Sequence, residues 1–139
     1  MLRPHGTPLL TGNAAILAAH DAATAHLGVP WRMPTSDEIE ALVNNCTTTW
    51  ITTNGVSGRL VTGKGSYANR SIFLPAAGYG LDSYLNFAGS FGFYGSSSTQ
   101  NSGFPNDAWC LDFNSGYFYR SYYHRCNGQS VRPVRGFAE

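Results

Sequence analysis

Apolar residues recur with a helical period in the first third of the chain and with a strand-like alternation after it. An Ala-rich stretch predicts a helix from Gly12 to Leu27. A second helix is predicted from Ser36 to Asn45, because Ile39, Leu42 and Val43 then share one face. The first part of the chain is therefore expected to be helical.

The second helix carries a strong start signal. The Thr35 hydroxyl can accept the amide of Glu38, while the Glu38 carboxylate can accept the amide of Thr35, which is the capping-box arrangement. The neighbouring acids Asp37 and Glu40 could be mistaken for a catalytic cluster. Acids in the first turn complement the helix dipole, and we interpret them as structural.

Helical periodicity stops after this helix, and β-branched residues follow. We predict a strand from Thr47 to Thr53, a hairpin turn at Asn54 and Gly55, and a returning strand from Arg59 to Thr62. A short buried strand follows from Ser71 to Leu74. This pattern predicts a hairpin and a further short strand after the helix.

The second half of the chain is rich in Gly, Ser, Asn and aromatic residues, so we expect long loops between short strands from residue 75 to 107. The predicted strands are Phe91 to Ser97, Ala108 to Phe113 and Tyr117 to Tyr119, with Ser130 to Val134 closing the sheet. The whole chain, 1–139, is expected to be one α+β domain with two helices, short and mostly antiparallel strands, and a loop-rich second half.

Composition narrows the choice of partner. Only 17 residues are charged and the net charge is +1, so electrostatic binding to nucleic acid or membranes is not expected. No apolar stretch reaches the roughly 20 residues of a membrane span, and the first residues lack the apolar core of a signal peptide. We therefore expect no membrane insertion, and any export signal would lie outside this sequence.

The chain contains three cysteines, Cys46, Cys110 and Cys126, which cannot all pair with one another. Their spacing matches neither a metal site nor a redox CxxC motif. Three free thiols and a Cys110 to Cys126 bridge both stay open at this point.

One C-terminal stretch has the composition of a contact surface. From Tyr117 to Asn127 there is no aliphatic residue, and tyrosines are crowded together with Ser, Arg and His. Tyrosine supplies large, rigid contact area, and Ser and Asn supply adaptable hydrogen bonds, as in antibody paratopes. The alternative is that these tyrosines pack over an under-filled core.

Several motifs resemble one known family. They are WRMPTSDEIEALVNNC, SIFLPAAGY, SFGFYGSSS and the C-terminal R-x-x-G-x-SVRPVR at Arg125 to Arg135. Together they resemble the major paralogous domain, a bacterial family with the C-type lectin fold, over almost the whole chain from Asp21. The C-terminal stretch is similar to the variable region of proteins that diversity-generating retroelements diversify.

The resemblance implies a bacterial or phage display protein with a fixed lectin-like frame and a hypervariable ligand-binding region at about residues 91–127. Such systems mutate template adenines, and randomised AAY codons never yield Lys, Glu, Gln, Trp or Met. The 18 residues from Cys110 to Asn127 contain none of these five types. Those types make up 11 of the 139 residues, so chance would give such a gap roughly one time in four.

The alternation along the C-terminal stretch is the stronger argument, since every second residue of a strand shares a face. The expected frame contains Trp109, Leu111 and Phe113. The expected exposed, ligand-binding face consists of Cys110, Asp112, Tyr117, Tyr119, Ser121, Tyr122, Tyr123, His124, Cys126 and Asn127. Additional contacts are expected from Tyr94, Ser98, Asn101, Phe104 and Asn106.

The resemblance departs from the family pattern at one position. Members usually carry Trp where this chain has Gly95. The smaller residue would either leave a groove or be compensated by repacking.

Two other functions remain as alternatives. One is a surface or adhesion module of the same family with a fixed ligand. The other is an oxidase similar to the formylglycine-generating enzyme, which uses two thiols close together in sequence; Cys110 and Cys126 are 16 apart. We expect no enzymatic activity.

The expected partner is a protein or cell-surface ligand, and the expected location is a cell surface or virion. No cofactor is expected. Asp82, Asp107 and Asp112 are scattered and lack the acidic run of sugar-binding lectins, although a structural calcium ion held by carbonyls would leave no sequence trace. No pattern in the sequence specifies an oligomeric state.

Overall fold

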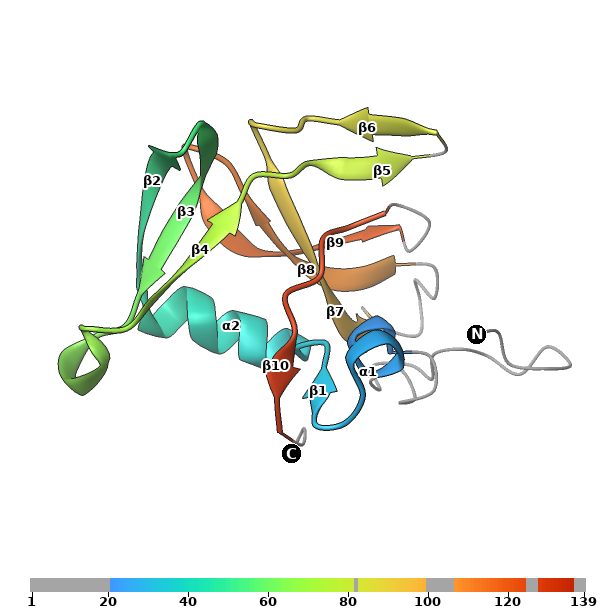
Figure 1. Cartoon of the computed structure of the whole chain (residues 1–139), viewed down its shortest axis with the longest axis horizontal. Helices are drawn as coiled ribbons and strands as arrows, with labels where there is room; N and C mark the ends of the chain where they lie inside the picture. The colour runs from blue at the N-terminus through green and yellow to red at the C-terminus, as the bar shows by residue number, and fades with distance from the viewer. Residues whose placement is uncertain (1–20, 82, 100–106, 125–127, 137–139) are drawn as a thin grey trace, which may run out of the picture.

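A computed structural model describes residues 21–81, 83–99, 107–124 and 128–136. Within these residues the chain is an α+β domain, which confirms the predicted class (Figure 1). The elements in chain order are α1 (Ala22–Leu27), β1 (Trp31–Arg32), α2 (Ser36–Asn45), β2 (Thr47–Thr53), β3 (Val56–Thr62), the 3-10 turn η2 (Gly65–Tyr67), β4 (Ser71–Pro75), β5 (Tyr79–Leu81), β6 (Tyr84–Asn86), β7 (Gly92–Thr99), β8 (Asp107–Phe113), β9 (Phe118–His124) and β10 (Val134–Arg135).

The described strands form two three-stranded sheets, β2-β3-β4 and β7-β8-β9, and two two-stranded sheets, β5-β6 and β1-β10. Neighbouring strands within these sheets are antiparallel. Figure 1 shows α2 running below both larger sheets, with the β5–β6 hairpin on the opposite side of the molecule. The sheets and the helix enclose the core between them.

The helix α2 has the predicted bounds and the predicted capping box. The Thr35 hydroxyl accepts the Glu38 amide at 3.2 Å, and the Glu38 carboxylate accepts the Thr35 amide at 2.9 Å. The Ser36 amide, which has no partner within the helix, donates to the Ser98 hydroxyl at 3.0 Å. Ile39 is buried beneath the sheets, so the apolar face is the one that the periodicity predicted.

The first helix is shorter than predicted. Asp21 is extended and caps α1, because its carboxylate accepts the Thr24 amide at 3.0 Å. The same carboxylate also accepts the Met33 amide at 3.0 Å, which ties α1 to the segment before α2. A continuous helix from Gly12 to Leu27 is therefore wrong, and residues 12–20 lie outside the described part of the chain.

The β2–β3 hairpin is confirmed. Asn54 and Gly55 both have positive φ, 52° and 78°, as a two-residue turn of this twist requires. The returning strand is longer than predicted, since β3 begins at Val56 and pairs along its full length with β2. The short strand predicted from Ser71 to Leu74 is present as β4, and it pairs with the other edge of β3.

The core joins the two larger sheets to α2. Phe113 and Leu111 of β8 are 0% and 2% exposed, which confirms these two frame residues. The buried cluster consists of Ile39, Val61, Leu74, Ala76, Tyr94, Leu111 and Phe113.

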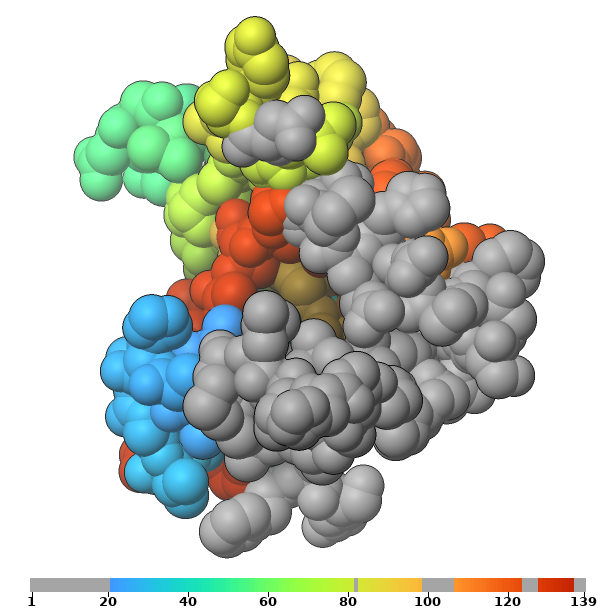
Figure 2. Space-filling view, turned by 90° about the vertical axis from the view of Figure 1, so that its right-hand side faces the viewer, coloured from blue at the N-terminus to red at the C-terminus, as the bar shows by residue number. Residues whose placement is uncertain are grey.

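Two parts of the second half differ from the prediction. The segment expected to be long loops contains the β5–β6 hairpin, which Figure 2 shows projecting at the top of the molecule. The residues expected to form one closing strand are divided between two partners. Ser130 is hydrogen-bonded beside β7 through Phe93 and Gly95, each at 2.9 Å, whereas β10 pairs with β1. A proline at position 133 separates the two pairings.

Candidate ligand-binding surface

The register of β8 and β9 decides which predicted site residues share a face. Asp112 lies opposite Tyr119, and Cys110 lies opposite Ser121, so these four belong to one face of the sheet. Tyr122 lies opposite Trp109 on the other face. The prediction of one face that includes both Tyr122 and Tyr123 is therefore wrong, since neighbouring strand residues point in opposite directions.

Cys110 and Asp112 are both 0% exposed, which corrects the expectation that they contribute to an exposed face. The reason is that β8 is the central strand of its sheet, and both of its faces are covered. Leu111 and Phe113 face the core, while Tyr117 and Tyr123 cover Asp112 from the other side.

Three tyrosines surround this buried carboxylate. The hydroxyl of Tyr123 donates to Asp112 Oδ2 at 2.9 Å, and that of Tyr117 donates to Oδ1 at 3.3 Å. The rings of Tyr117 and Tyr119 are in contact, with centroids 4.7 Å apart, and Tyr119 is 42% exposed. We call Asp112, Tyr117, Tyr119 and Tyr123 the tyrosine cluster.

Burial dominates the electrostatics of the tyrosine cluster. It raises the pKa of Asp112 above the usual aspartate value, and the hydrogen bonds from Tyr123 and Tyr117 oppose that effect. Burial and then the nearby carboxylate raise the pKa of Tyr117 to about 12, and burial also raises the pKa of Tyr123. Both hydroxyls thus stay protonated at neutral pH and hold the rings in place as donors.

The turn before β9 is fixed by a residue that sequence reasoning did not single out. Arg59 is buried and donates from Nε and Nη2 to the Asn114 carbonyl at 3.1 and 3.0 Å. The Asn114 side chain in turn accepts the Tyr117 amide at 3.0 Å. Arg59 therefore positions the start of the cluster from the neighbouring sheet. An arginine inside an apolar strand was the only signal for this role.

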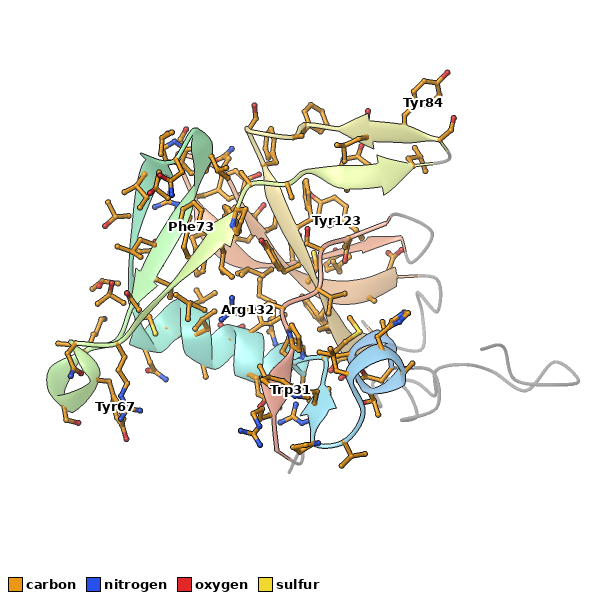
Figure 3. All side chains as sticks on the ribbon, in the orientation of Figure 1. Trp31, Tyr67, Phe73, Tyr84, Tyr123 and Arg132 are labelled. Atoms are coloured by element: carbon orange, nitrogen blue, oxygen red, sulfur yellow. The ribbon has the colours of Figure 1, made fainter. Side chains whose placement is uncertain are left out.

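The tyrosine cluster continues into the β5–β6 hairpin through aromatic contacts. Tyr123 contacts Phe93 edge-to-face with centroids 5.1 Å apart, and Phe93 contacts Tyr79 in the same way at 5.2 Å. Figure 3 shows Tyr123 between its sheet and the hairpin, with Tyr84 pointing outward near the hairpin tip. The hairpin and the residue that follows it also expose large apolar side chains that the sequence analysis had assigned to loops: Leu81, Tyr84 and Leu85 in the hairpin, and Phe87 after it.

The opposite face of β9 carries a different group of residues. Tyr122 is 45% exposed and contacts Trp109 edge-to-face, with centroids 5.3 Å apart. Arg120 lies over the same indole at 4.3 Å and forms a 2.7 Å ion pair with Glu40 of α2. Trp109 shares the face of the frame residues Leu111 and Phe113, but it is half-buried and lies outside the buried core cluster.

Two of the additional contacts predicted from the sequence are structural. Tyr94 belongs to the core cluster, stacks on Phe113 and donates to the Pro75 carbonyl at 2.8 Å. Ser98 is buried and caps α2. Neither belongs to the exposed surface of β9. Five further predicted site residues lie outside the described part of the chain: Asn101, Phe104, Asn106, Cys126 and Asn127. For His124, only the backbone is described, as part of β9.

Gly95 leaves no groove. A Cβ at this position would lie 3.1 Å from the Met33 methyl and 3.4 Å from the Gln129 amide oxygen. The space that a large aromatic would occupy is thus filled by these two side chains, and repacking compensates for the smaller residue.

The described cysteines, Cys46 and Cys110, are free thiols, so the alternative of a bridge from Cys110 is wrong. Burial raises the pKa of Cys110 to about 12, with a smaller contribution from Asp112. Among the described residues, no three His, Cys, Asp or Glu side chains gather as a metal site requires. None of the described helices is long and apolar enough to span a membrane.

Comparison with known proteins identifies the family but carries no functional information. No curated protein and no solved structure gives a significant match. Residues 63–134, just over half of the chain, match the family described as "Domain of unknown function (DUF8237)". This segment includes β4, the β5–β6 hairpin and the whole tyrosine cluster. The chain therefore belongs to the DUF8237 family.

Proposed function

We propose that the chain is a ligand-binding protein whose contact surface lies on β9 and the neighbouring β5–β6 hairpin. The observation that carries this proposal is the tyrosine cluster: three tyrosines held around one buried carboxylate, with Tyr119 reaching the surface. Side chains held in place before binding lose little entropy when a ligand docks, so their contact area converts efficiently into affinity.

The chemistry of this surface favours a macromolecular ligand. Strand β6 and the residue after it expose Tyr84 at 73%, Leu85 at 68% and Phe87 at 55%, and a soluble protein rarely exposes so many large apolar side chains together without a partner. Aromatic residues of this kind supply most of the binding energy in protein interfaces. A protein or a cell-surface target is the partner that we propose.

We further propose the C-type lectin fold and diversification by a retroelement, as the motifs imply. The burial pattern supports a frame and a variable surface at separate positions. Exposed or half-buried residues that do not hold the buried carboxylate can change without loss of the core: Tyr119, Ser121 and Tyr122. Cys110 and Asp112 are fully buried, so substitutions there would be restricted.

An adhesion module with a fixed ligand is the second candidate, since it would present the same surface. The presence of a template copy of the gene segment distinguishes the two. The oxidase alternative has less support. A thiol with a pKa of about 12 supplies almost no thiolate at neutral pH, and Cys110 is 0% exposed.

The binding proposal can be tested on whole cells. Fluorescently labelled protein is mixed with candidate target cells, and the variants Tyr119→Ala and Tyr67→Ala are compared. Tyr67 is 59% exposed and lies on η2, far from the cluster (Figure 3), so it is a matched control. We expect Tyr119→Ala to weaken binding about tenfold or more, as removal of an interface tyrosine does, and Tyr67→Ala to leave it unchanged. Equal binding by both variants would place the ligand elsewhere.

A further inference from the structure

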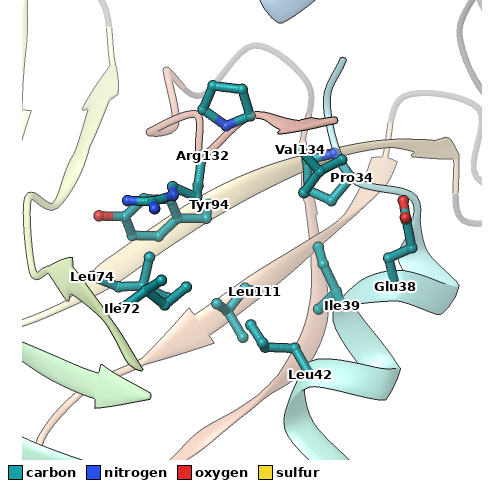
Figure 4. A pocket seen from close by; sticks show the side chains of 11 residues that line it. Pro34, Glu38, Ile39, Leu42, Ile72, Leu74, Tyr94, Leu111, Arg132 and Val134 are labelled. Atoms are coloured by element: carbon teal, nitrogen blue, oxygen red, sulfur yellow. The ribbon is translucent and has the colours of Figure 1, made fainter. Parts of the chain in front are cut away.

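A pocket of about 280 Å³ lies on the side of the domain that faces α2. It is lined by residues of α2, β4, β7 and β8, by Pro34 before α2, and by residues 132–134, which lead into β10. Figure 4 shows Tyr94 and Arg132 on one side, Ile39 and Leu42 on the other, and Ile72 and Leu74 below. Leu111 lines the pocket and Asp112 belongs to the tyrosine cluster, so the two sites lie on opposite faces of β8.

The floor of the pocket is apolar and belongs to the core. Ile39, Leu74 and Leu111 are 2–3% exposed and are packed within the buried cluster. Close packing of this kind prevents the floor from collapsing inward to fill the space. A bound molecule would thus meet an aliphatic surface that is already in place.

Two polar groups on the lining are already satisfied. The Glu38 carboxylate accepts Arg32 Nη2 at 2.8 Å and the Thr35 amide at 2.9 Å, and the Arg32 bond holds the pKa of Glu38 below its usual range. The Tyr94 hydroxyl donates to the Pro75 carbonyl. Neither group offers a strong free charge to a ligand.

Arg132 differs from these two groups. Its side chain lines the pocket from an exposed position, and among the described residues it forms no hydrogen bond and no ion pair. Its positive charge is close enough to Tyr94 to lower the pKa of that hydroxyl against the larger effect of burial. The pocket therefore combines an apolar floor with one uncommitted guanidinium, a group whose planar fork matches a carboxylate.

We infer that this pocket binds a small amphipathic carboxylate, with its hydrocarbon body on the aliphatic floor and its carboxylate on Arg132. The volume is just below the range of roughly 300–1,000 Å³ that is typical of ligand pockets, so a short chain or a single ring fits better than a larger molecule. This site is independent of the ligand proposed for the tyrosine cluster.

The test is a calorimetric titration of the full-length protein with sodium octanoate, kept below its micellar concentration, with 1-octanol as the uncharged control. We expect saturable octanoate binding. Arg132→Gln should weaken it about tenfold, the usual effect of losing a hydrogen bond to a charged group, and should leave octanol binding unchanged. Arg135→Gln is the matched control, because Arg135 lies over the Trp31 ring, away from the pocket lining.

A second variant fills the pocket. Leu42 is half-buried and lines the pocket. The larger side chain of Leu42→Trp would occupy the pocket, so this variant should bind neither octanoate nor octanol while its melting curve stays cooperative. No saturable octanoate binding to the wild type would overturn the inference. So would octanoate binding that is unchanged in Arg132→Gln or in Leu42→Trp, because the carboxylate or the body would then lie elsewhere.

Discussion

The hydroxyl of Tyr123 donates a 2.9 Å hydrogen bond to Asp112, a carboxylate that is 0% exposed at the centre of the β7-β8-β9 sheet. The bond connects a residue of the proposed contact surface to the floor beneath it. Because burial raises the pKa of Asp112, the ionised carboxylate is held at a cost in stability.

The first prediction follows from the sign of that shift. A carboxyl group with a raised pKa contributes stability below its usual pKa, and this contribution is lost as the pH rises through the raised value. Asp112→Asn cannot ionise, so its stability relative to the wild type should increase as the pH rises from about 4, near the usual aspartate pKa, toward neutrality. Urea unfolding at a series of pH values measures this. A stability difference that does not change with pH would contradict the raised pKa.

The second prediction separates the surface from the core. Tyr119 is 42% exposed, so Tyr119→Ala should change the free energy of unfolding by no more than about 1 kcal/mol. Leu111 is 2% exposed and leaves a cavity when truncated, so Leu111→Ala should cost about 2–5 kcal/mol. Denaturant unfolding of both variants measures the two effects. If Tyr119→Ala proves as destabilising as Leu111→Ala, this tyrosine is a core residue.

The third prediction concerns the arginine that holds the turn before β9. Arg59→Lys removes the pair of hydrogen bonds that Nε and Nη2 donate to the Asn114 carbonyl, and it should destabilise the domain by about 1–2 kcal/mol. Hydrogen–deuterium exchange of the Tyr117 amide, which donates a hydrogen bond to the Asn114 side chain, should become faster. Arg70→Lys is the control, because Arg70 is exposed and lies over the Tyr67 ring. Unchanged Tyr117 exchange in the Arg59 variant would refute the positioning role.

The fourth prediction concerns thiol chemistry. Cys110 is 0% exposed and burial raises its pKa to about 12, whereas Cys46 is half-buried. In a variant that has Cys46 and Cys126 replaced by serine, Cys110 is the single thiol. Ellman's reagent should react with it only after denaturant unfolds the protein. Rapid labelling of Cys110 in the native state would show that β8 opens readily.

The fifth prediction tests the capping box of α2. Thr35→Ala removes the acceptor of the Glu38 amide and should cost on the order of 1 kcal/mol, whereas Thr35→Ser keeps a hydroxyl and should cost much less. Thermal unfolding of both variants gives the comparison. Equal melting temperatures for Thr35→Ala and the wild type would place the start of the helix elsewhere.

Local signals in the sequence predicted the parts of the fold that depend on neighbouring residues. The capping box located α2, and Asn54-Gly55 located the β2–β3 hairpin, because each depends on residues a few positions apart. The predicted start of the first helix was wrong because Asp21 is extended and its carboxylate accepts the Met33 amide. Helix propensity does not describe such a contact between separate segments. The β5–β6 hairpin was missed because its exposed aromatic residues have no alternating apolar pattern.

The candidate site was predicted in composition but not in geometry. Alternation placed Asp112, Tyr119 and Ser121 on one face, which the strand register bears out. Alternation alone could not tell that β8 is a central strand covered on both faces, so Cys110 and Asp112 were expected to be exposed. The contributions of Arg59, Phe93 and the hairpin come from contacts between separate sheets, which no local pattern records.

The central claim is that a retroelement diversifies a ligand-binding surface on a fixed frame, and sequencing the DNA around the gene tests it most directly. We predict a reverse transcriptase gene and a near-identical copy of the segment from about Phe91 to Arg135 that differs almost only at adenines of the copy. The differences should fall on codons of exposed or half-buried residues such as Tyr119, Ser121 and Tyr122, and spare those of Leu111 and Phe113. A neighbourhood with neither a reverse transcriptase nor a copy would contradict the claim and leave the adhesion module with a fixed ligand in its place.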